Sequence, residues 1–115
     1  MRIETIKGKR VAFYDGPPIA TETDANDIIG ETYGLEVDVI AVPVAGFVDD
    51  FFWLRSGLAG AVLQKLQNYG FRCAVIGDIS RFTAESPSLR DFVRESNARG
   101  QTMFLPDRAA LEARL

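Results

Sequence analysis

The hydrophobic pattern of this chain changes repeatedly between short apolar runs and segments with apolar residues at helical spacing. Short apolar runs bounded by turn residues predict strands, and a period of about 3.6 residues predicts amphipathic helices. The turn Lys7-Gly8-Lys9 separates the first two runs and predicts a β-hairpin. The predicted strands are Arg2–Ile6, Arg10–Tyr14, Val37–Val42, Phe71–Ile76 and Gln101–Leu105.

Helical spacing fills the gaps between the later strands and follows the last strand. The first predicted helix ends at Gly34, the third begins at Ser88 and ends at Gly100, and the last is capped by Asp107. The second helix is the most regular and runs from about Gly57 to Tyr69. Its buried face is predicted to consist of Leu58, Ala59, Val62, Leu63, Leu66 and Tyr69.

The resulting order of elements is ββαβαβαβα. The later strands are almost continuously apolar, which is typical of parallel strands covered on both faces. A chain of 115 residues has the length of one domain. The sequence therefore predicts a single small α/β layered domain over residues 1–115, with a mostly parallel sheet.

Charge and composition exclude several functional classes. The net charge of −3 and the pI of about 4.9 argue against a nucleic-acid-binding surface or a polybasic membrane surface. The chain has no histidine, which excludes Ser-His-Asp and Cys-His catalysis, and Cys73 alone cannot provide a zinc site. We therefore expect no metal and no cofactor. The start of the chain does not resemble a signal peptide, no apolar run is long enough to span a membrane, and no internal disulfide can form, so we expect a cytoplasmic protein.

Candidate binding residues lie in the loops that follow the predicted strands. The carboxyl ends of parallel strands meet at one edge of a sheet, so the loops after the third and fourth strands are expected to lie together. A small-residue turn opens the second helix, where free backbone N–H groups favour an anion. The principal candidates are Arg55, Ser56, Gly57, Asp78, Ser80 and Arg81, with further contributions expected from Asp15, Asp49, Asp50, Glu95 and Asn97.

These features also have structural explanations. Ser56 can cap the second helix, and Gly57 and Gly60 can allow that helix to pack closely on the sheet. Loops are polar in most proteins because water covers them. Each candidate residue therefore has two interpretations, one as part of a binding site and one as part of the fold.

Aromatic and charged residues near these loops have similar alternatives. The run Phe51-Phe52-Trp53 forms either a partner-binding patch or part of the core, and we expect at least two of its side chains to be buried. A solvated helix face is the interpretation of Arg90, Arg94, Glu95 and Asn97, with the alternative that the segment Glu95-Ser96-Asn97 turns towards the loops.

Three segments of the chain carry a family resemblance: FFWLRSGLAGAVLQKL, VIGDIS and SLRDFVRESNARGQTMF. They resemble a small bacterial family, the domain of unknown function DUF4180, and the resemblance extends from about Thr23 to the end of the chain. Trp53 and Ala61 stand where acidic residues are usual in that family. This departure argues against an acid–metal role for the segment.

The order of elements and the small-residue turn also resemble STAS domains, the fold of bacterial anti-sigma factor antagonists. In those regulators the turn at the start of the second helix carries a phosphorylatable serine. Here the turn is Leu54-Arg55-Ser56-Gly57, and Arg55 stands at the position of the phosphorylated hydroxyl. The resemblance implies a binding or regulatory domain without catalytic chemistry.

The leading hypothesis is a non-enzymatic, STAS-like regulatory or interaction domain. It binds a protein partner or a small anionic ligand around Arg55 and Ser56, and homodimer formation stays open. The alternative is an enzyme that holds Mg²⁺ with Asp49, Asp50 and Asp78, or a phospho-acceptor domain with Asp78 as the acceptor. Nucleic acids and membranes are not expected as partners.

Overall fold

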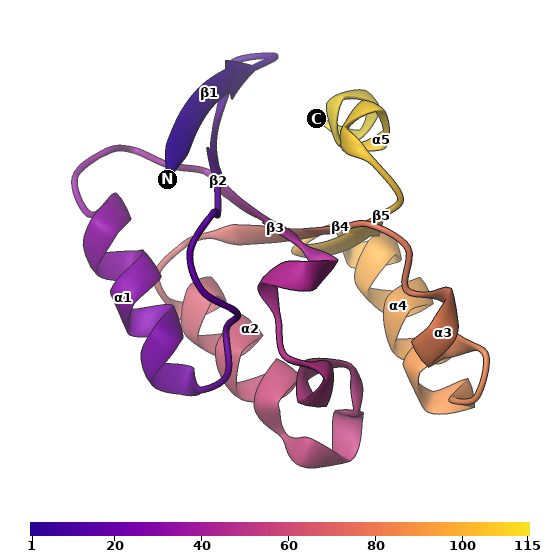
Figure 1. Cartoon of the computed structure of the whole chain (residues 1–115). Coiled ribbons are helices and arrows are strands. Elements are labelled where there is room, and N and C mark those ends of the chain that lie inside the picture. The colour runs from indigo at the N-terminus through magenta and orange to yellow at the C-terminus, as the bar shows by residue number, and fades with distance from the viewer.

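The strands form a five-stranded sheet in the order β1-β2-β3-β4-β5, in a computed structural model that describes residues 1–115 (Figure 1). β1 and β2 form an antiparallel hairpin, and the later strands are all parallel. This arrangement confirms the predicted α/β class and the mostly parallel sheet. The strands are β1 (Arg2–Ile6), β2 (Lys9–Phe13), β3 (Val39–Pro43), β4 (Arg72–Ile76) and β5 (Thr102–Leu105).

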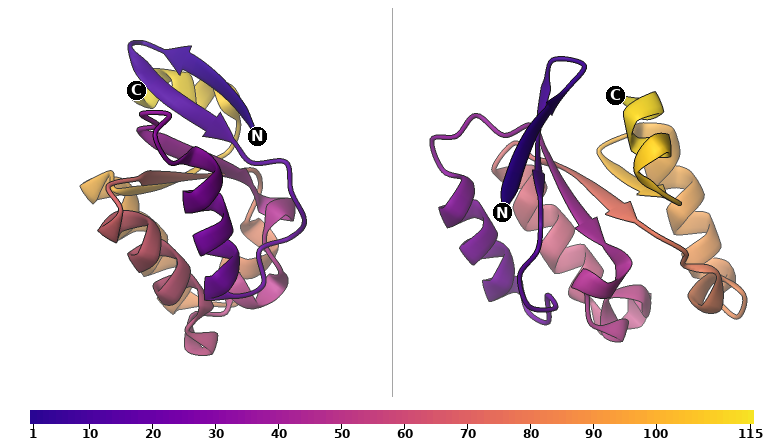
Figure 2. Two further views of the ribbon diagram at one scale, coloured as in Figure 1. Left: turned by 90° about the vertical axis from the view of Figure 1, so that its left-hand side faces the viewer. Right: turned by 45° about the horizontal axis from the view of Figure 1, so that its top comes forward.

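The helices lie on both faces of this sheet. Figures 1 and 2 show α1, α2 and α4 on one face, and α5 on the other face, opposite the β1–β2 hairpin. Neighbouring parallel strands follow one another in sequence, and crossovers of one hand place the connecting helices on the same face. The helices are α1 (Glu22–Thr32), α2 (Leu58–Asn68), α3 (Ser80–Thr83), α4 (Pro87–Arg99) and α5 (Arg108–Arg114).

Successive side chains of each strand point to opposite faces of the sheet. Ile40 and Val42 belong to the larger core, under α1, α2 and α4, whereas Val39 and Ala41 belong to a smaller core that includes Leu111 of α5. The period of two residues in a strand produces this division. Both faces of β3 are therefore apolar, which explains why its sequence is a continuous apolar run.

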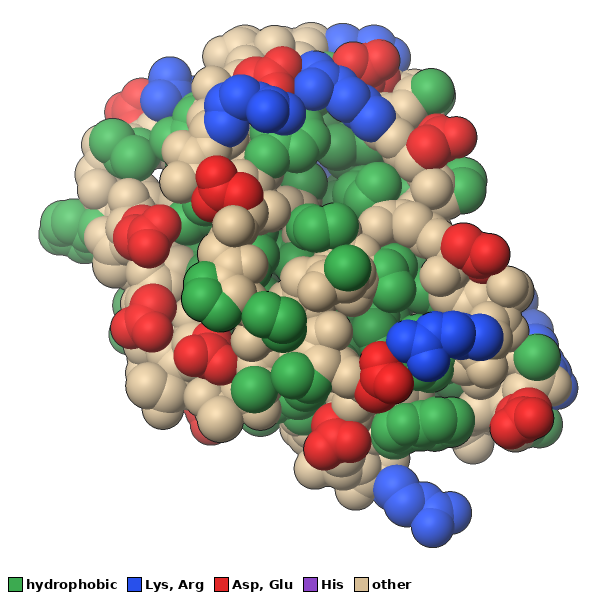
Figure 3. Space-filling view, viewed as in Figure 1, with side chains coloured by type: hydrophobic (Ala, Val, Ile, Leu, Met, Phe, Trp, Pro, Cys, Tyr) green, Lys and Arg blue, Asp and Glu red, His purple; other side chains and the backbone are tan.

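The second face of the sheet is only partly covered. A cleft of about 320 Å³ lies between the hairpin and α5, and Phe13, Ala41 and Leu111 line it. Figure 3 shows Lys and Arg side chains along the top of the molecule, above a hollow in which hydrophobic side chains gather. Arg108 of α5 reaches across to Glu4 of β1, with a distance of 2.7 Å between Nη2 and Oε1.

The long connection between β3 and α2 builds an aromatic cluster. It consists of short 3₁₀ turns at Val44–Gly46, Asp49–Phe52 and Leu54–Ser56, which the sequence pattern did not reveal. The rings of Phe52 and Phe82 stack with their centroids 4.4 Å apart. Phe51 and Phe52 are buried, which confirms that at least two of the three consecutive aromatic residues belong to the core.

Two predicted helix features need correction. α4 begins at Pro87 rather than Ser88, because Ser86 is its N-cap and accepts a hydrogen bond from the backbone N–H of Leu89. Proline at the first position suits a helix start, where its missing N–H has no intrahelical partner to lose. The short helix α3 was also missed, since four residues are too few to show a helical period.

The predicted buried face of α2 is correct at its centre and wrong at both ends. Val62, Leu63 and Leu66 are buried, but Leu58 is only half-buried. Tyr69 is 60% exposed because α2 ends at Asn68, so the following residue leaves the helical period. None of the helices has both the length and the apolar character needed to cross a membrane.

Candidate functional site

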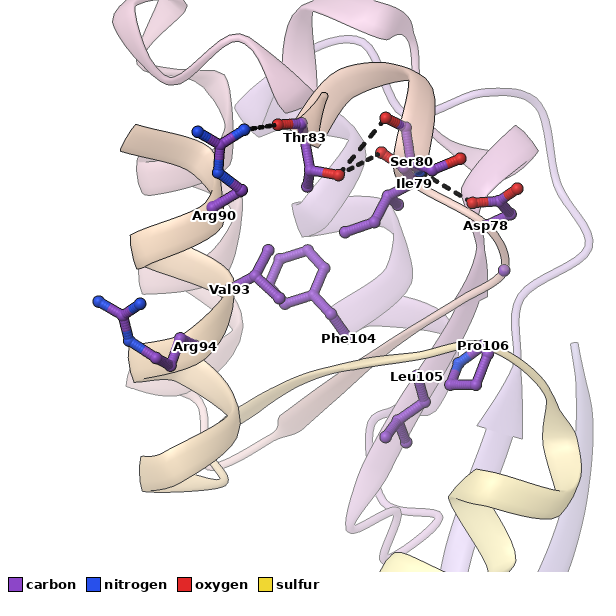
Figure 4. Close-up of a pocket in the computed structure, with 11 residues that line it drawn as sticks. Asp78, Ile79, Ser80, Thr83, Arg90, Val93, Arg94, Phe104, Leu105 and Pro106 are labelled. Carbon is purple, nitrogen blue, oxygen red and sulfur yellow. Dashed lines mark hydrogen bonds between the residues drawn. The ribbon is translucent and has the colours of Figure 1, made fainter. Parts of the chain in front are cut away.

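A cavity of about 470 Å³ opens beside the carboxyl ends of β4 and β5. α3 and α4 form its walls, and the end of β5 forms its base (Figure 4). In parallel α/β sheets, ligands bind beyond the carboxyl ends of the strands. The cavity contains two of the predicted candidates, Asp78 and Ser80.

Asp78 occupies one end of this cavity directly after β4. Its Oδ1 accepts a hydrogen bond from the backbone N–H of Ser80 at 2.8 Å. The Ser80 backbone N–H, followed by the Ser80 side chain, lowers the pKa of Asp78 below its ordinary value. The carboxylate is therefore charged at neutral pH. The donor that holds Asp78 is thus the backbone of Ser80 rather than an arginine.

Two arginines on α4 form the opposite side of the cavity. Arg90 donates from Nη1 to the backbone carbonyl of Thr83 at 2.6 Å, which ties α4 to the end of α3. Arg94 lies one turn further along α4 and pairs with Asp91, with 2.9 Å between Nη2 and Oδ1. A spacing of four residues puts both arginines on one side of the helix. Figure 4 shows Arg90 reaching towards Thr83, whereas the guanidinium group of Arg94 is turned away from Phe104, and both are well separated from Asp78.

Apolar side chains lie between these two charged ends. Val93 and Phe104 lie centrally in the view of Figure 4, with Leu105 and Pro106 below them. Phe104 is almost completely buried, and Phe92 packs edge-on against it with 5.9 Å between ring centroids. The cavity thus combines an apolar base with a few charged and hydroxyl groups at its margins, which is the usual composition of a small-molecule site.

The predicted turn at the start of α2 has a structural role. The hydroxyl of Ser56 accepts a hydrogen bond from the N–H of Leu58 at 3.2 Å and donates to the carbonyl of Asp50 at 2.7 Å. Gly57 has φ of 78°, a left-handed conformation that favours glycine. The N-cap of α2 is Gly57, so the prediction that Ser56 caps this helix is wrong, and the Ser56 hydroxyl instead holds together the turn that precedes the helix.

Arg55 lies in a different cleft from Asp78. This cleft, of about 480 Å³, is also lined by Trp53, Glu85 and Ser86. Trp53 is 41% exposed and lies edge-on to Phe82, with 5.8 Å between ring centroids. Of the predicted principal candidates, Asp78 and Ser80 therefore line one hollow and Arg55 another, and the remaining three line neither: Ser56, Gly57 and Arg81.

Arg81 joins the loops that follow β3 and β4. Its Nη2 lies 2.8 Å from Oδ1 of Asp49, and its guanidinium lies 4.0 Å from the centroid of the Phe82 ring. The loops after the third and fourth strands thus meet, as the sequence predicted. The partner of Arg81 is Asp49, however, so Asp78 remains free of an arginine.

The remaining predicted contributors lie outside the cavity. Asp15 faces the N-terminal amine, 3.6 Å away, and Glu95 is exposed on α4. Asp50 contributes its backbone carbonyl to the Ser56 contact. Asn97 was expected to turn towards the loops, but its side chain binds the backbone of Phe104 on β5.

The sequence interpretation missed the arginines of the cavity. Arg90 and Arg94 were assigned to a solvated face, although both line the cavity. Their only signal in the sequence is a spacing of four residues around the apolar Val93. Thr83 and Phe104 carried no signal, because one lies in the undetected helix α3 and the other in a strand assigned to the core.

The structure offers few groups for metal binding or nucleophilic chemistry. No three His, Cys, Asp or Glu side chains are grouped so that they could hold a metal ion. Burial raises the pKa of the Cys73 thiol to about 12, so the reactive thiolate form is scarce at neutral pH.

The fold and the cavity define a class of protein: an α/β domain with a solvent-open pocket at the carboxyl edge of a mostly parallel sheet. The chain belongs to the DUF4180 family, whose family model, described as a domain of unknown function, matches residues 7–115. Neither a curated protein nor a solved structure gives a match to the chain.

Proposed function

We propose that this domain is a non-enzymatic binding module that takes a small anionic ligand in the cavity between α3, α4 and the end of β5. The observation that carries the proposal is the placement of Arg90 on one wall of this cavity, with its guanidinium group held against the end of α3. The hydroxyl groups of Ser80 and Thr83 lie on the α3 side. Guanidinium and hydroxyl groups above an apolar base are suited to hold a carboxylate or phosphate group.

Arg90 keeps hydrogen-bond donors for a ligand. A guanidinium group has five N–H donors. Within the protein, Arg90 donates from Nη1 to carbonyls at the end of α3. The contact with the Thr83 carbonyl holds the Arg90 guanidinium in place, which reduces the entropy lost when an anion binds.

The absence of histidine and the burial of Cys73 favour binding over catalysis. Asp78 is a weak base, because its pKa is lowered. The Mg²⁺-dependent and phospho-acceptor alternatives have less support, since Asp49 is engaged by Arg81 and is not grouped with two further carboxylates. A STAS-like regulatory role in a bacterial cytoplasm agrees with this proposal and stays a prediction.

The proposal is tested by titrating the protein with caproate, a simple carboxylate with an apolar tail, and following backbone amide signals by NMR. We expect shifts concentrated in α3, α4 and the end of β5. Arg90→Gln should weaken binding about tenfold or more, because a hydrogen bond to a charged group contributes about 1.5–3 kcal/mol. Arg99→Gln is the matched control, since Arg99 is an exposed arginine of α4 that does not line the cavity. Equal affinity of both variants would contradict the proposal.

A protein partner at the second cleft is the other candidate function. Trp53 is the observation that favours it, because a tryptophan that stays 41% exposed beside an unpaired arginine, Arg55, has the composition of an interface hot spot. A photo-crosslinking amino acid at position 53, introduced in the native cell, should give one discrete adduct. The same amino acid at position 69, where another exposed aromatic stands, is the control. Identical adducts at both positions would contradict a specific site.

A further inference from the structure

The charges of the cavity have opposite signs at its two ends. Asp78 lies at one end and Arg90 lies at the other, as Figure 4 shows. Val93 and Phe104 separate them, and no ion pair joins them. A ligand that carries only negative charge would satisfy Arg90 but would meet repulsion at Asp78.

We infer that the ligand is a zwitterion, with its cationic group at Asp78, its anionic group at Arg90, and an apolar segment over Phe104. This inference rests on the proposed function and names the ligand class for the same cavity. Primary amines joined to a carboxylate or phosphate by a short apolar chain belong to this class.

Asp78 is prepared to receive a cation. Its Oδ1 accepts the backbone N–H of Ser80, and no lysine or arginine of the protein pairs with its carboxylate. The hydrogen bond from Ser80 fixes the carboxylate and stabilises its charged form. An ammonium group would therefore meet a charged, positioned acceptor.

The middle of the cavity explains why the two ligand charges should be joined by an apolar segment. Val93, Leu105 and Pro106 offer no hydrogen-bonding side-chain group to a ligand. A short alkyl chain covers these side chains and removes apolar surface from water, at about 25 cal/mol per Å². Free inorganic phosphate would leave this surface and Asp78 unused.

The test compares three probes of matched length by amide NMR: aminocaproate, caproate and hexylamine. Aminocaproate has both charges, and each of the others lacks one. We expect aminocaproate to bind at least about tenfold more tightly than either, because each end then forms a charge-assisted contact. The shorter γ-aminobutyrate and the longer aminocaprylate extend the series, so that the result does not depend on one chain length.

Variants assign the two ends of the ligand. Asp78→Asn keeps an oxygen that accepts the Ser80 N–H, and it should lower the affinity for aminocaproate to that for caproate. Arg90→Gln should weaken binding of both carboxylates and leave hexylamine unchanged. Glu95→Gln is the control, because Glu95 is an exposed carboxylate on α4 outside the cavity.

The outcomes separate this inference from the proposed function. In one outcome, caproate binds as tightly as every amino acid of the series, and Asp78→Asn changes neither the affinity for caproate nor that for aminocaproate. That result would contradict the inference of a zwitterionic ligand and leave the proposed anion site supported. If caproate and all the amino acids fail to shift the cavity signals, both fail. A spectrum of Asp78→Asn that otherwise matches the wild type shows that the fold is intact.

Discussion

Asn97 on α4 forms two hydrogen bonds with the backbone of Phe104 on β5. Its Oδ1 accepts from the Phe104 N–H at 2.7 Å, and its Nδ2 donates to the Phe104 carbonyl at 3.2 Å. The neighbouring Leu105 carbonyl accepts from Gly77 on the β4 side, so Phe104 turns its backbone groups to the free edge of the sheet. The amide of Asn97 thus takes the place of a missing strand and protects the edge from pairing with another chain.

We predict that Asn97→Ala lowers the free energy of unfolding by about 1–3 kcal/mol, because partly buried backbone groups lose their partner. Urea denaturation measures the change. Asn68→Ala is the control, since its amide contacts only the exposed Gln64 and should change stability by less than about 0.5 kcal/mol. Equal losses in both variants would show that water satisfies the edge of β5 without Asn97.

The buried face of α2 gives a second prediction. Leu63→Ala and Leu66→Ala should each lower the free energy of unfolding by about 2–5 kcal/mol, the usual effect of truncating a core leucine. Leu58→Ala should cost less than half of that, because Leu58 is only half-buried at the start of the helix. Unfolding curves in urea test the order. A larger effect at Leu58 than at Leu66 would mean that α2 faces the sheet differently.

Hydrophobic periodicity was sufficient to predict most of this fold. The strands are short apolar runs bounded by turn residues, the four longer helices have a helical period, and the apolar residues of those helices pack on the sheet. Periodicity fails where an element is short or ends. α3 has only four residues, which are too few to show a helical period. Tyr69 follows the last residue of α2, so its side chain does not lie on the buried face that the period predicts.

The cavity could be predicted only in part. Asp78 and Ser80 follow a strand end, which is a general rule for parallel sheets. Arg90 and Arg94 come from a helix face whose neighbour is α3, and an exposed helix side has the same polar pattern whether it borders water or a cavity. Asn97 shows the same limit, because its amide has a partner only once α4 and β5 are placed together.

Glu4 should make the protein's stability depend on pH in the acid range. The Arg108 side chain, followed by that of Arg2, lowers the pKa of Glu4 from 4.5 to about 2. A lowered carboxylate pKa means that the unfolded chain binds the proton more readily than the folded one. The contribution of Glu4 to the free energy of unfolding is therefore present above pH 4.5 and is lost as the pH falls towards about 2.

Urea midpoints measured across this range test the Glu4 prediction. Glu4→Gln should be less stable than the wild type at neutral pH, and the difference should shrink as the pH falls. Glu36→Gln is the control, because Glu36 forms no ion pair within the protein. A constant difference between wild type and Glu4→Gln from neutral to acid pH would show that the Arg108 contact does not depend on the charge of Glu4.

The two glycines at the start of α2 should respond oppositely to alanine. Gly57 has φ of 78°, so Gly57→Ala forces a left-handed backbone on alanine and should lower stability by about 1–2 kcal/mol. Gly60 lies inside the helix, and a Cβ there would meet no atom within 4 Å. Gly60→Ala should therefore raise stability by about 0.5–1 kcal/mol, the difference in helix preference between the two residues.

Urea denaturation of the two variants distinguishes this arrangement from the close helix–sheet packing that the sequence suggested for both glycines. Close packing at Gly60 would make Gly60→Ala destabilising, because the added methyl group would push α2 away from its neighbours. The structure instead leaves open space at Gly60 and assigns the requirement for glycine to the backbone of Gly57 alone. A gain in stability at position 60 together with a loss at position 57 is the result that this geometry requires.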